Sequence, residues 1–189
     1  RVTMLKRIGA EEGGEFKAVA SGTLPSGKPV VVNADGTVSV VSGSDASIGS
    51  AAVFESASTG KTATTFDSSN NKIVISYRDV GNSNHGTAVV GTVSGSSISF
   101  GTPVVFNAAS TDDEAHITFD SNSNKVVVVY STSAQGTAKV GTVSGTSISF
   151  GSATVFDAAQ GTYIGVTFDS NSNKVVVVYT GTNNYVESR

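Results

Sequence analysis

The alternation of apolar and polar residues predicts strands and turns in most of the chain, with no helical periodicity in the repeated part. Residues 115–120 alternate, residues 121–124 form a polar turn, and residues 125–131 are a continuous, mostly β-branched run. Such a run is typical of a strand that is covered on both faces. Residues 137–156 then supply two more strands around a Ser-Gly turn. This part of the chain therefore predicts four short antiparallel strands.

The same pattern recurs along the chain in nearly identical sequence. Residues 91–101 recur as residues 141–151, and residues 120–130 recur as residues 169–179. A more divergent copy of the second motif occupies residues 67–77. The phenylalanine before each of the three polar turns is spaced by 53 and then 49 residues. The chain therefore contains tandem units of about 50 residues.

Four strands in each unit favour an all-β fold of tandem four-stranded antiparallel blades, as in a β-propeller. Such blades are small sheets that bury their faces against one another, and a β-solenoid or a row of stacked sheets is the alternative. Complete units are predicted at 62–107 and 115–157, with partial units from residue 46 and from residue 163. A closed propeller needs at least four blades. We therefore expect that the chain continues beyond Arg189 or that several copies assemble.

The N-terminal part of the sequence differs from the repeats. Residues 1–17 hold seven charged residues and three glycines, which predicts an extended anchoring arm, with a frayed terminus as the alternative. Residues 18–45 predict a β-hairpin lead-in, in which residues 33–36 form the tight turn. The predicted organisation is therefore an arm, a hairpin and a repeat region over residues 46–189.

Composition and charge exclude several classes of function. The 189 residues are only 14% charged, with a net charge of −3, which leaves no basic surface for nucleic acid. No apolar run approaches the roughly 20 residues of a membrane helix, so we expect no membrane insertion. The chain has no cysteine, which excludes disulfides and thiolate chemistry.

The polar turns are candidate cation sites because oxygen-bearing side chains alternate along them, as in calcium loops. The candidates are Asp120, Asn122, Asn124, Asp169, Asn171 and Asn173. However, Lys125 and Val126 follow the first of these turns, where a calcium loop would continue with glycine and a carboxylate. Asp and Asn also favour turns because they bond to their own backbone. We therefore expect hairpin turns, and neither a metal ion nor another cofactor.

Three tyrosines occupy equivalent repeat positions and are candidate ligand contacts. Tyr77, Tyr130 and Tyr179 each follow the β-branched run of their unit. They either pack at the blade ends or form a rim of aromatic rings that binds a glycan. Tyr163 and Tyr185 are not repeated and are candidate surface contacts.

The sequence predicts no catalytic site. His85 and His116 lack partners at metal-ligand spacing, and the acidic cluster at residues 112–114 lies in a predicted loop. No nucleophile elbow, phosphate loop or zincin helix is present. We therefore predict that the protein is not an enzyme; a lyase or hydrolase acting on polysaccharide is a less favoured alternative.

Two resemblances add to this prediction. The four-strand unit with a polar turn after Phe-Asp is similar to the blades of sialidase-like propellers, but that family's arginines and its Ser-x-Asp-x-Gly-x-Thr-Trp box are absent. No catalytic residue therefore carries over. A closer resemblance, over residues 16–180, is to repeat-bearing virion proteins of tailed bacteriophages, often described as tail fibres. It is carried by residues 91–101, 119–127, 141–151 and 168–176.

The phage resemblance implies a structural virion protein, as a fibre, spike or decoration protein, with a virion or extracellular location. It implies adhesion to a glycan or protein of the host surface, and an N-terminal arm that binds other virion proteins. A homo-oligomer is expected, with a trimer as the guess for a fibre. The alternative function is a secreted or cell-surface adhesin or lectin that binds glycans.

Overall fold

A computed structural model of the chain describes residues 3–6, 15–24, 30–40, 49–111, 115–159, 162–181 and 185–189. The chain divides into two compact units, residues 1–47 and 48–189. The described elements are antiparallel strands and one short 3-10 helix, which confirms the all-β class. The predicted acidic cluster at residues 112–114 lies outside the described residues.

The first unit begins with a two-stranded ribbon. Strand β1 (Thr3–Lys6) pairs antiparallel with β2 (Glu15–Ala18). The described residues of the predicted arm are therefore two extended strands that hydrogen-bond to each other. The anchoring role of this segment stays a prediction.

The predicted lead-in hairpin is present in the first unit. Strand β3 (Val30–Val32) pairs with β4 (Val38–Val40). The turn between them ends at Gly36, whose φ of 79° favours glycine. The Asp35 carboxylate accepts hydrogen bonds from the Thr37 N–H and hydroxyl at 2.9 and 2.7 Å.

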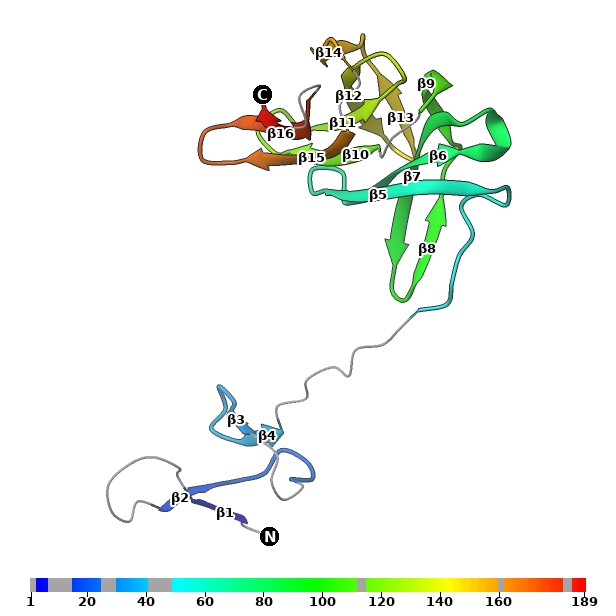
Figure 1. Cartoon of the computed structure of the whole chain (residues 1–189). Coiled ribbons are helices and arrows are strands. Elements are labelled where there is room, and N and C mark those ends of the chain that lie inside the picture. Colours follow the sequence, from blue (N-terminus) through cyan, green and yellow to red (C-terminus); the bar gives the residue numbers. More distant parts are fainter. Residues whose placement is uncertain are drawn as a thin grey trace. The chain divides into compact units, whose positions relative to one another are not determined.

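The second unit contains three antiparallel sheets, one for each repeat (Figure 1). Sheet 1 consists of β5 (Thr59–Asp67), β6 (Lys72–Asp79), β7 (His85–Ser94), β8 (Ser97–Phe100) and β9 (Val104–Ser110). Sheet 2 consists of β10 (His116–Asp120), β11 (Lys125–Ser131), β12 (Gly136–Ser144), β13 (Ser147–Phe150) and β14 (Thr154–Asp157). Sheet 3 consists of β15 (Thr162–Asp169), β16 (Lys174–Thr180) and β17 (Val186–Ser188).

The fourth strand of each complete sheet is interrupted by a glycine. Strands β8 and β9 both pair with β7, and β13 and β14 both pair with β12. The breaks begin at Gly101 and Gly151, whose N–H groups still donate to the carbonyl oxygens of Val90 and Val140, each at 2.9 Å. A glycine inside a strand commonly marks such a kink or bulge.

Strand β11 belongs to sheet 2, which lies between sheets 1 and 3, and the strand is covered on both faces. Val126, Val128 and Tyr130 belong to the core shared with sheet 1, and Val127 and Val129 belong to the core shared with sheet 3. All five side chains are at most 8% exposed. The first strands β5, β10 and β15 lie side by side (Figure 1). The prediction that β-branched runs are buried between sheets is therefore confirmed for sheet 2.

The face of sheet 1 and the face of sheet 3 that point away from sheet 2 expose apolar side chains. Val143 in sheet 2 is 8% exposed, whereas its repeat equivalent Val93 in sheet 1 is 53% exposed. Similarly, Val129 is fully buried, whereas its equivalent Val178 in sheet 3 is 42% exposed. Among the described residues the structure contains several antiparallel sheets that pack on one another, and these sheets do not form a closed ring.

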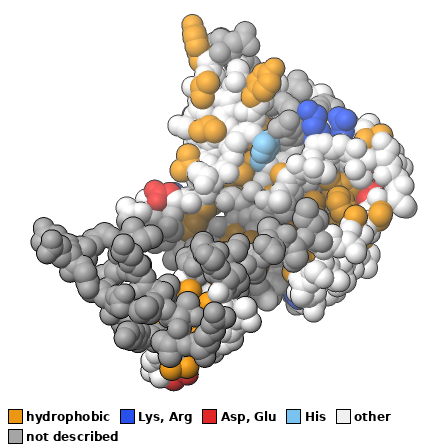
Figure 2. Space-filling view, turned by 90° about the horizontal axis from the view of Figure 1, so that it is seen from below, with side chains coloured by type: hydrophobic (Ala, Val, Ile, Leu, Met, Phe, Trp, Pro, Cys, Tyr) orange, Lys and Arg blue, Asp and Glu red, His pale blue; other side chains and the backbone are white. Residues whose placement is uncertain are grey.

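The described surface is poor in charge. Figure 2 shows one face, on which most described atoms are neither charged nor hydrophobic side-chain atoms, and hydrophobic patches are scattered. Only small groups of Lys, Arg, Asp and Glu side chains appear there. This agrees with the 14% of charged residues in the sequence.

The glycine that directly follows β8 or β13 also sets how closely two sheets approach. A Cβ built on Gly101 would collide with the carbonyl oxygen of Thr146, in the β12–β13 turn of the next sheet. Gly49 has the same relation to Ser96. Around Gly151 the nearest atom is the Val140 carbonyl oxygen at 3.8 Å, because the described part of sheet 3 contains no turn equivalent to β12–β13.

We predict that Gly101→Ala lowers the free energy of unfolding by about 1–3 kcal/mol, because the added methyl forces two sheets apart. The matched control Gly151→Ala should change it by less than about 0.5 kcal/mol, since there is space for the methyl. Urea unfolding followed by circular dichroism measures both values. Equal effects of the two substitutions would contradict the close contact between sheets.

Candidate functional site

The connections between strands fall into two groups at opposite ends of the sheets. In an antiparallel meander, the first and third turns share one end, and the second turn lies at the other. At the first end the turns are nearly identical in the repeats: residues 68–71, 121–124 and 170–173. At the second end they differ, and only sheet 1 has a 3-10 helix there, η1 (Val80–Asn82), among the described residues. We call these the constant end and the variable end.

At the constant end, each aspartate organises its own turn. The first carboxylate oxygen, Oδ1, of Asp67, Asp120 and Asp169 accepts hydrogen bonds from the backbone N–H groups two and three residues later, at 2.9–3.3 Å. The turn closes with an asparagine at a φ of 52–55°, a left-handed conformation that asparagine tolerates. These closing residues are Asn71, Asn124 and Asn173.

The second carboxylate oxygen is also bonded within the turn. Oδ2 of Asp120 accepts from the Ser123 hydroxyl at 2.7 Å, and Oδ2 of Asp169 accepts from the Ser172 hydroxyl at 2.6 Å. Asn122 and Asn171 contribute their backbone N–H groups to the same carboxylates. The hairpin interpretation therefore accounts for these candidate residues. In the part of the chain that the structure describes, no three His, Asp or Glu side chains are grouped to hold a metal ion.

These hydrogen bonds favour the ionised aspartates. Burial disfavours the charge of Asp67 and Asp120, but hydrogen bonds from the turn outweigh it and lower both pKa values. At the fully exposed Asp169, the Ser172 hydroxyl is the main cause of a lowered pKa. A group whose pKa is lower in the folded state stabilises the fold above its unfolded pKa, and this contribution disappears as the pH falls through the folded pKa.

The three repeated tyrosines lie in the core and do not form an exposed rim. Tyr77, Tyr130 and Tyr179 are 0%, 3% and 1% exposed. Each ring contacts the phenylalanine that precedes its sheet in the chain, with ring centroids 5.1–5.2 Å apart, in the pairs Phe54–Tyr77, Phe106–Tyr130 and Phe156–Tyr179. The packing interpretation therefore describes these residues, because each tyrosine falls on the strand face that the preceding chain segment covers. The phenylalanines are repeated at a similar spacing, and this shared period is the sequence signal that could have predicted the pairs.

Burial also keeps the tyrosine hydroxyls protonated. Burial, followed by the charges of Glu55 and Asp79, raises the pKa of Tyr77 to about 12. Burial raises the pKa of Tyr130 as well. At Tyr179, burial and then the hydrogen bond to Glu187 raise the pKa. These groups therefore stay neutral at physiological pH and act as packing residues.

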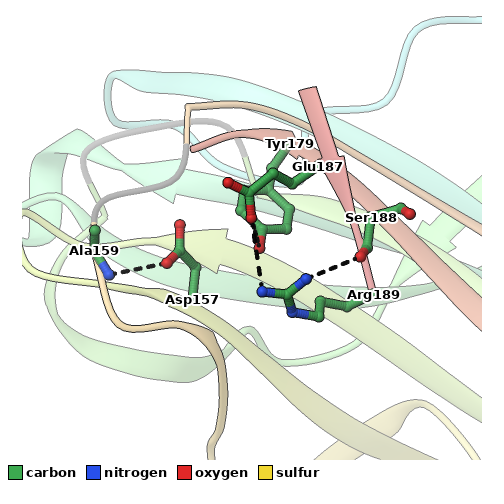
Figure 3. Close-up of polar contacts among 6 residues, drawn as sticks. All are labelled: Asp157, Ala159, Tyr179, Glu187, Ser188 and Arg189. Atoms are coloured by element: carbon green, nitrogen blue, oxygen red, sulfur yellow. Dashed lines mark hydrogen bonds and ion pairs between the residues drawn. The ribbon is translucent and has the colours of Figure 1, made fainter. Parts of the chain in front are cut away.

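A polar group lies at the variable end, where the edge of sheet 2 meets sheet 3 (Figure 3). The Tyr179 hydroxyl donates to the Glu187 carboxylate at 3.1 Å, and Arg189 forms an ion pair with the same carboxylate at 3.6 Å. The Asp157 carboxylate accepts the Ala159 N–H at 3.1 Å, and its second oxygen is buried without a hydrogen-bond partner among the described residues. The first set of contacts joins β16 to β17 within sheet 3, and the second holds the segment that follows β14.

The two tyrosines that are not repeated are exposed beside this group. Tyr163 is 84% exposed and Tyr185 is 71% exposed, which confirms their predicted surface position. Thr162 pairs with Thr180, which in turn pairs with Val186. The two tyrosines, each adjacent to one of these paired residues, therefore flank β16 at the same end of sheet 3. Exposed aromatic rings of this kind are suited to contacts with a ligand.

Comparison with known proteins found no match to this chain among family models, curated proteins or solved structures. In the described parts of the chain, no helix has the length and apolar character needed to cross a membrane. His85 and His116, which the sequence analysis considered as candidate site residues, are the first residues of β7 and β10, both at the variable end.

We predict that the triple substitution Asp67→Asn, Asp120→Asn and Asp169→Asn reduces the loss of the free energy of unfolding at acidic pH. In the native protein the free energy of unfolding should fall below about pH 4, because the unfolded chain binds more protons there. Asparagine cannot titrate, and its weaker hydrogen bonds should also lower stability at pH 7. Urea unfolding between pH 7 and pH 2.5 measures both effects.

The matched control is Ser68→Ala, Ser121→Ala and Ser170→Ala, in the same turns. These side chains are exposed and make no hydrogen bond that organises the described turns. The control should retain the native pH dependence. An unchanged loss of stability at acidic pH in the asparagine variant would show that the carboxylates do not stabilise the turns.

Proposed function

We propose that the three sheets are blades of a propeller-type array. In each sheet the chain starts at the strand that contacts the neighbouring sheets and continues outward to the edge strand, as in propeller blades. The contacts of β10 with β5 and with β15 support this order, because these are the first strands of the three sheets.

We further propose that the chain is a structural virion protein of a tailed phage, a fibre, spike or decoration protein that adheres to the host surface. The observation that carries the adhesion role is the division between the two ends of the sheets. Repeated residues form the core and the constant-end turns, whereas exposed Tyr163 and Tyr185 at the variable end are unique. A rigid scaffold with differing loops at one end is typical of recognition proteins.

The virion location rests on the resemblance of the repeats to virion proteins of tailed phages. In this proposal the N-terminal segment binds other virion proteins and the sheets extend away from it. The protein acts by binding and carries out no catalysis. A secreted or cell-surface adhesin or lectin is the second candidate, because the exposed tyrosines at the variable end would serve it equally well.

The proposed ligand is a glycan of the host surface. Tyrosine rings present a large apolar face with a polar hydroxyl, and sugar rings present apolar faces with polar edges. Tyr163 and Tyr185 are the described tyrosines exposed for such stacking. The adjacent carboxylate of Glu187 and guanidinium of Arg189 supply a hydrogen-bond acceptor and donors for sugar hydroxyls.

We predict that Tyr163→Ala with Tyr185→Ala weakens binding to host cells or to a glycan array about tenfold or more. Two stacking contacts of about 0.5–1.5 kcal/mol each account for this loss. The matched control, Asn122→Ala with Asn171→Ala, alters side chains at the constant end and should bind like the native protein. Retained binding in the tyrosine variant, with its fold intact by circular dichroism, would refute the variable end as the ligand site.

We predict that immunogold electron microscopy labels tailed-phage particles purified from the source of the protein, at the tail or the head surface. Labelling of a bacterial cell envelope without labelling of particles would favour the cellular adhesin instead. The same antibody on particles lacking the protein supplies the control.

A further inference from the structure

Residues 49–54 pair with no described strand, whereas the equivalent segments of the next two repeats do. Residues 104–106 and 154–156, the equivalents of residues 52–54, lie in β9 and β14, which pair with β7 and β12. The structure assigns residues 49–54 to no strand, and Val53 is 78% exposed. Nevertheless Phe54 packs on Tyr77, just as Phe106 packs on Tyr130 and Phe156 on Tyr179. The segment therefore occupies the position of an outer strand.

Strand β17 offers the matching free edge. Sheet 3 has the order β15-β16-β17, and no described strand pairs with the other side of β17. In sheet 2, Thr137 of β12 pairs with Val155 of β14. Tyr130 pairs with Thr137 and its equivalent Tyr179 pairs with Glu187, so Glu187 is the equivalent of Thr137 by strand register. Val53 is the equivalent of Val155, because each directly precedes the repeated phenylalanine. The free segment and the free edge therefore have the register that the complete sheets use.

The two open faces also match each other. Sheet 3 exposes Val178, whose equivalent Val129 is the side chain that sheet 2 buries against sheet 3. Sheet 1 exposes Phe66 and Val93, and the equivalent of Val93, Val143, is the side chain that sheet 2 buries against sheet 1. The end faces thus carry the two sides of an interface that already forms twice within the chain.

Sheet 2 lies between sheets 1 and 3, so one chain does not bring its own two end faces together. We propose that a second copy of this chain does so: sheet 3 of one copy packs on sheet 1 of the other, whose residues 49–54 pair with β17. Two copies joined in this way at both ends bring six sheets together, within the about four to eight blades of propellers. This contact is head to tail, and it does not rest on the proposed function.

An introduced disulfide tests the register directly, since the chain has no cysteine. Val53→Cys with Glu187→Cys places two thiols opposite each other across the proposed strand pair, at a separation that a disulfide spans. Oxidation should give a covalent dimer on a non-reducing gel. The control Val53→Cys with Val186→Cys puts the second thiol on the opposite face of β17 and should give much less dimer.

A dimer from the control pair as abundant as from the test pair would overturn the proposed register. A disulfide that leaves the mass of one chain, 19.1 kDa, would show closure within one copy and would overturn the proposal. Reduction of the test dimer to two chains confirms that the link is the introduced bond.

Sedimentation of the native sequence and of two face variants tests the head-to-tail contact without cysteine. The native protein should sediment as a dimer, with about twice the mass of one chain. Val178→Lys on sheet 3 and Val93→Lys on sheet 1 should each be monomeric, because every contact needs both faces. A mixture of the two variants should form a 1:1 dimer, because one unaltered face of each kind remains.

Each alternative arrangement gives a different result. A native protein that stays monomeric at about 100 µM would overturn the proposal. Self-association of either lysine variant alone would mean that identical faces meet, which also overturns it. Both lysines replace exposed side chains, so circular dichroism should show that the variants keep the native strand content.

Discussion

The fold depends on burial between sheets, because no single sheet can cover both of its own apolar faces. Strand β11 carries valines on both sides, and each side is buried only because another sheet lies against it. Hydrophobic burial is worth about 25 cal/mol for each Å² of apolar surface removed from water. The stability of each repeat therefore resides largely in its contacts with its neighbours, as in other repeat proteins.

The contacts between sheets are specified by a small set of repeated residues. A phenylalanine from the preceding chain segment packs on the tyrosine of each sheet, and such aromatic pairs add about 0.5–1.5 kcal/mol beyond their buried area. Glycines such as Gly101 let the backbone of one sheet approach the turn of the next. The buried tyrosines consequently belong to the scaffold, and recognition falls to residues outside the repeated set.

This division separates stability from function along each sheet. The constant end contains aspartate turns that satisfy their own polar groups. The variable end carries connections that differ between repeats and the exposed rings of Tyr163 and Tyr185. The open faces form a third kind of surface, because their residues match the buried interfaces of sheet 2.

The sequence alone determined the local structure: strand positions, the aspartate turns, the lead-in hairpin and the unit of about 50 residues. These follow from β-branched runs and turn residues, whose preferences act over a few residues. Only the tertiary structure decided that Tyr130 is buried, that β1 pairs with β2, and that Val93 is exposed while Val143 is not. Such near-identical repeats cannot encode that difference themselves, because the burial of a side chain depends on whether another sheet lies against it.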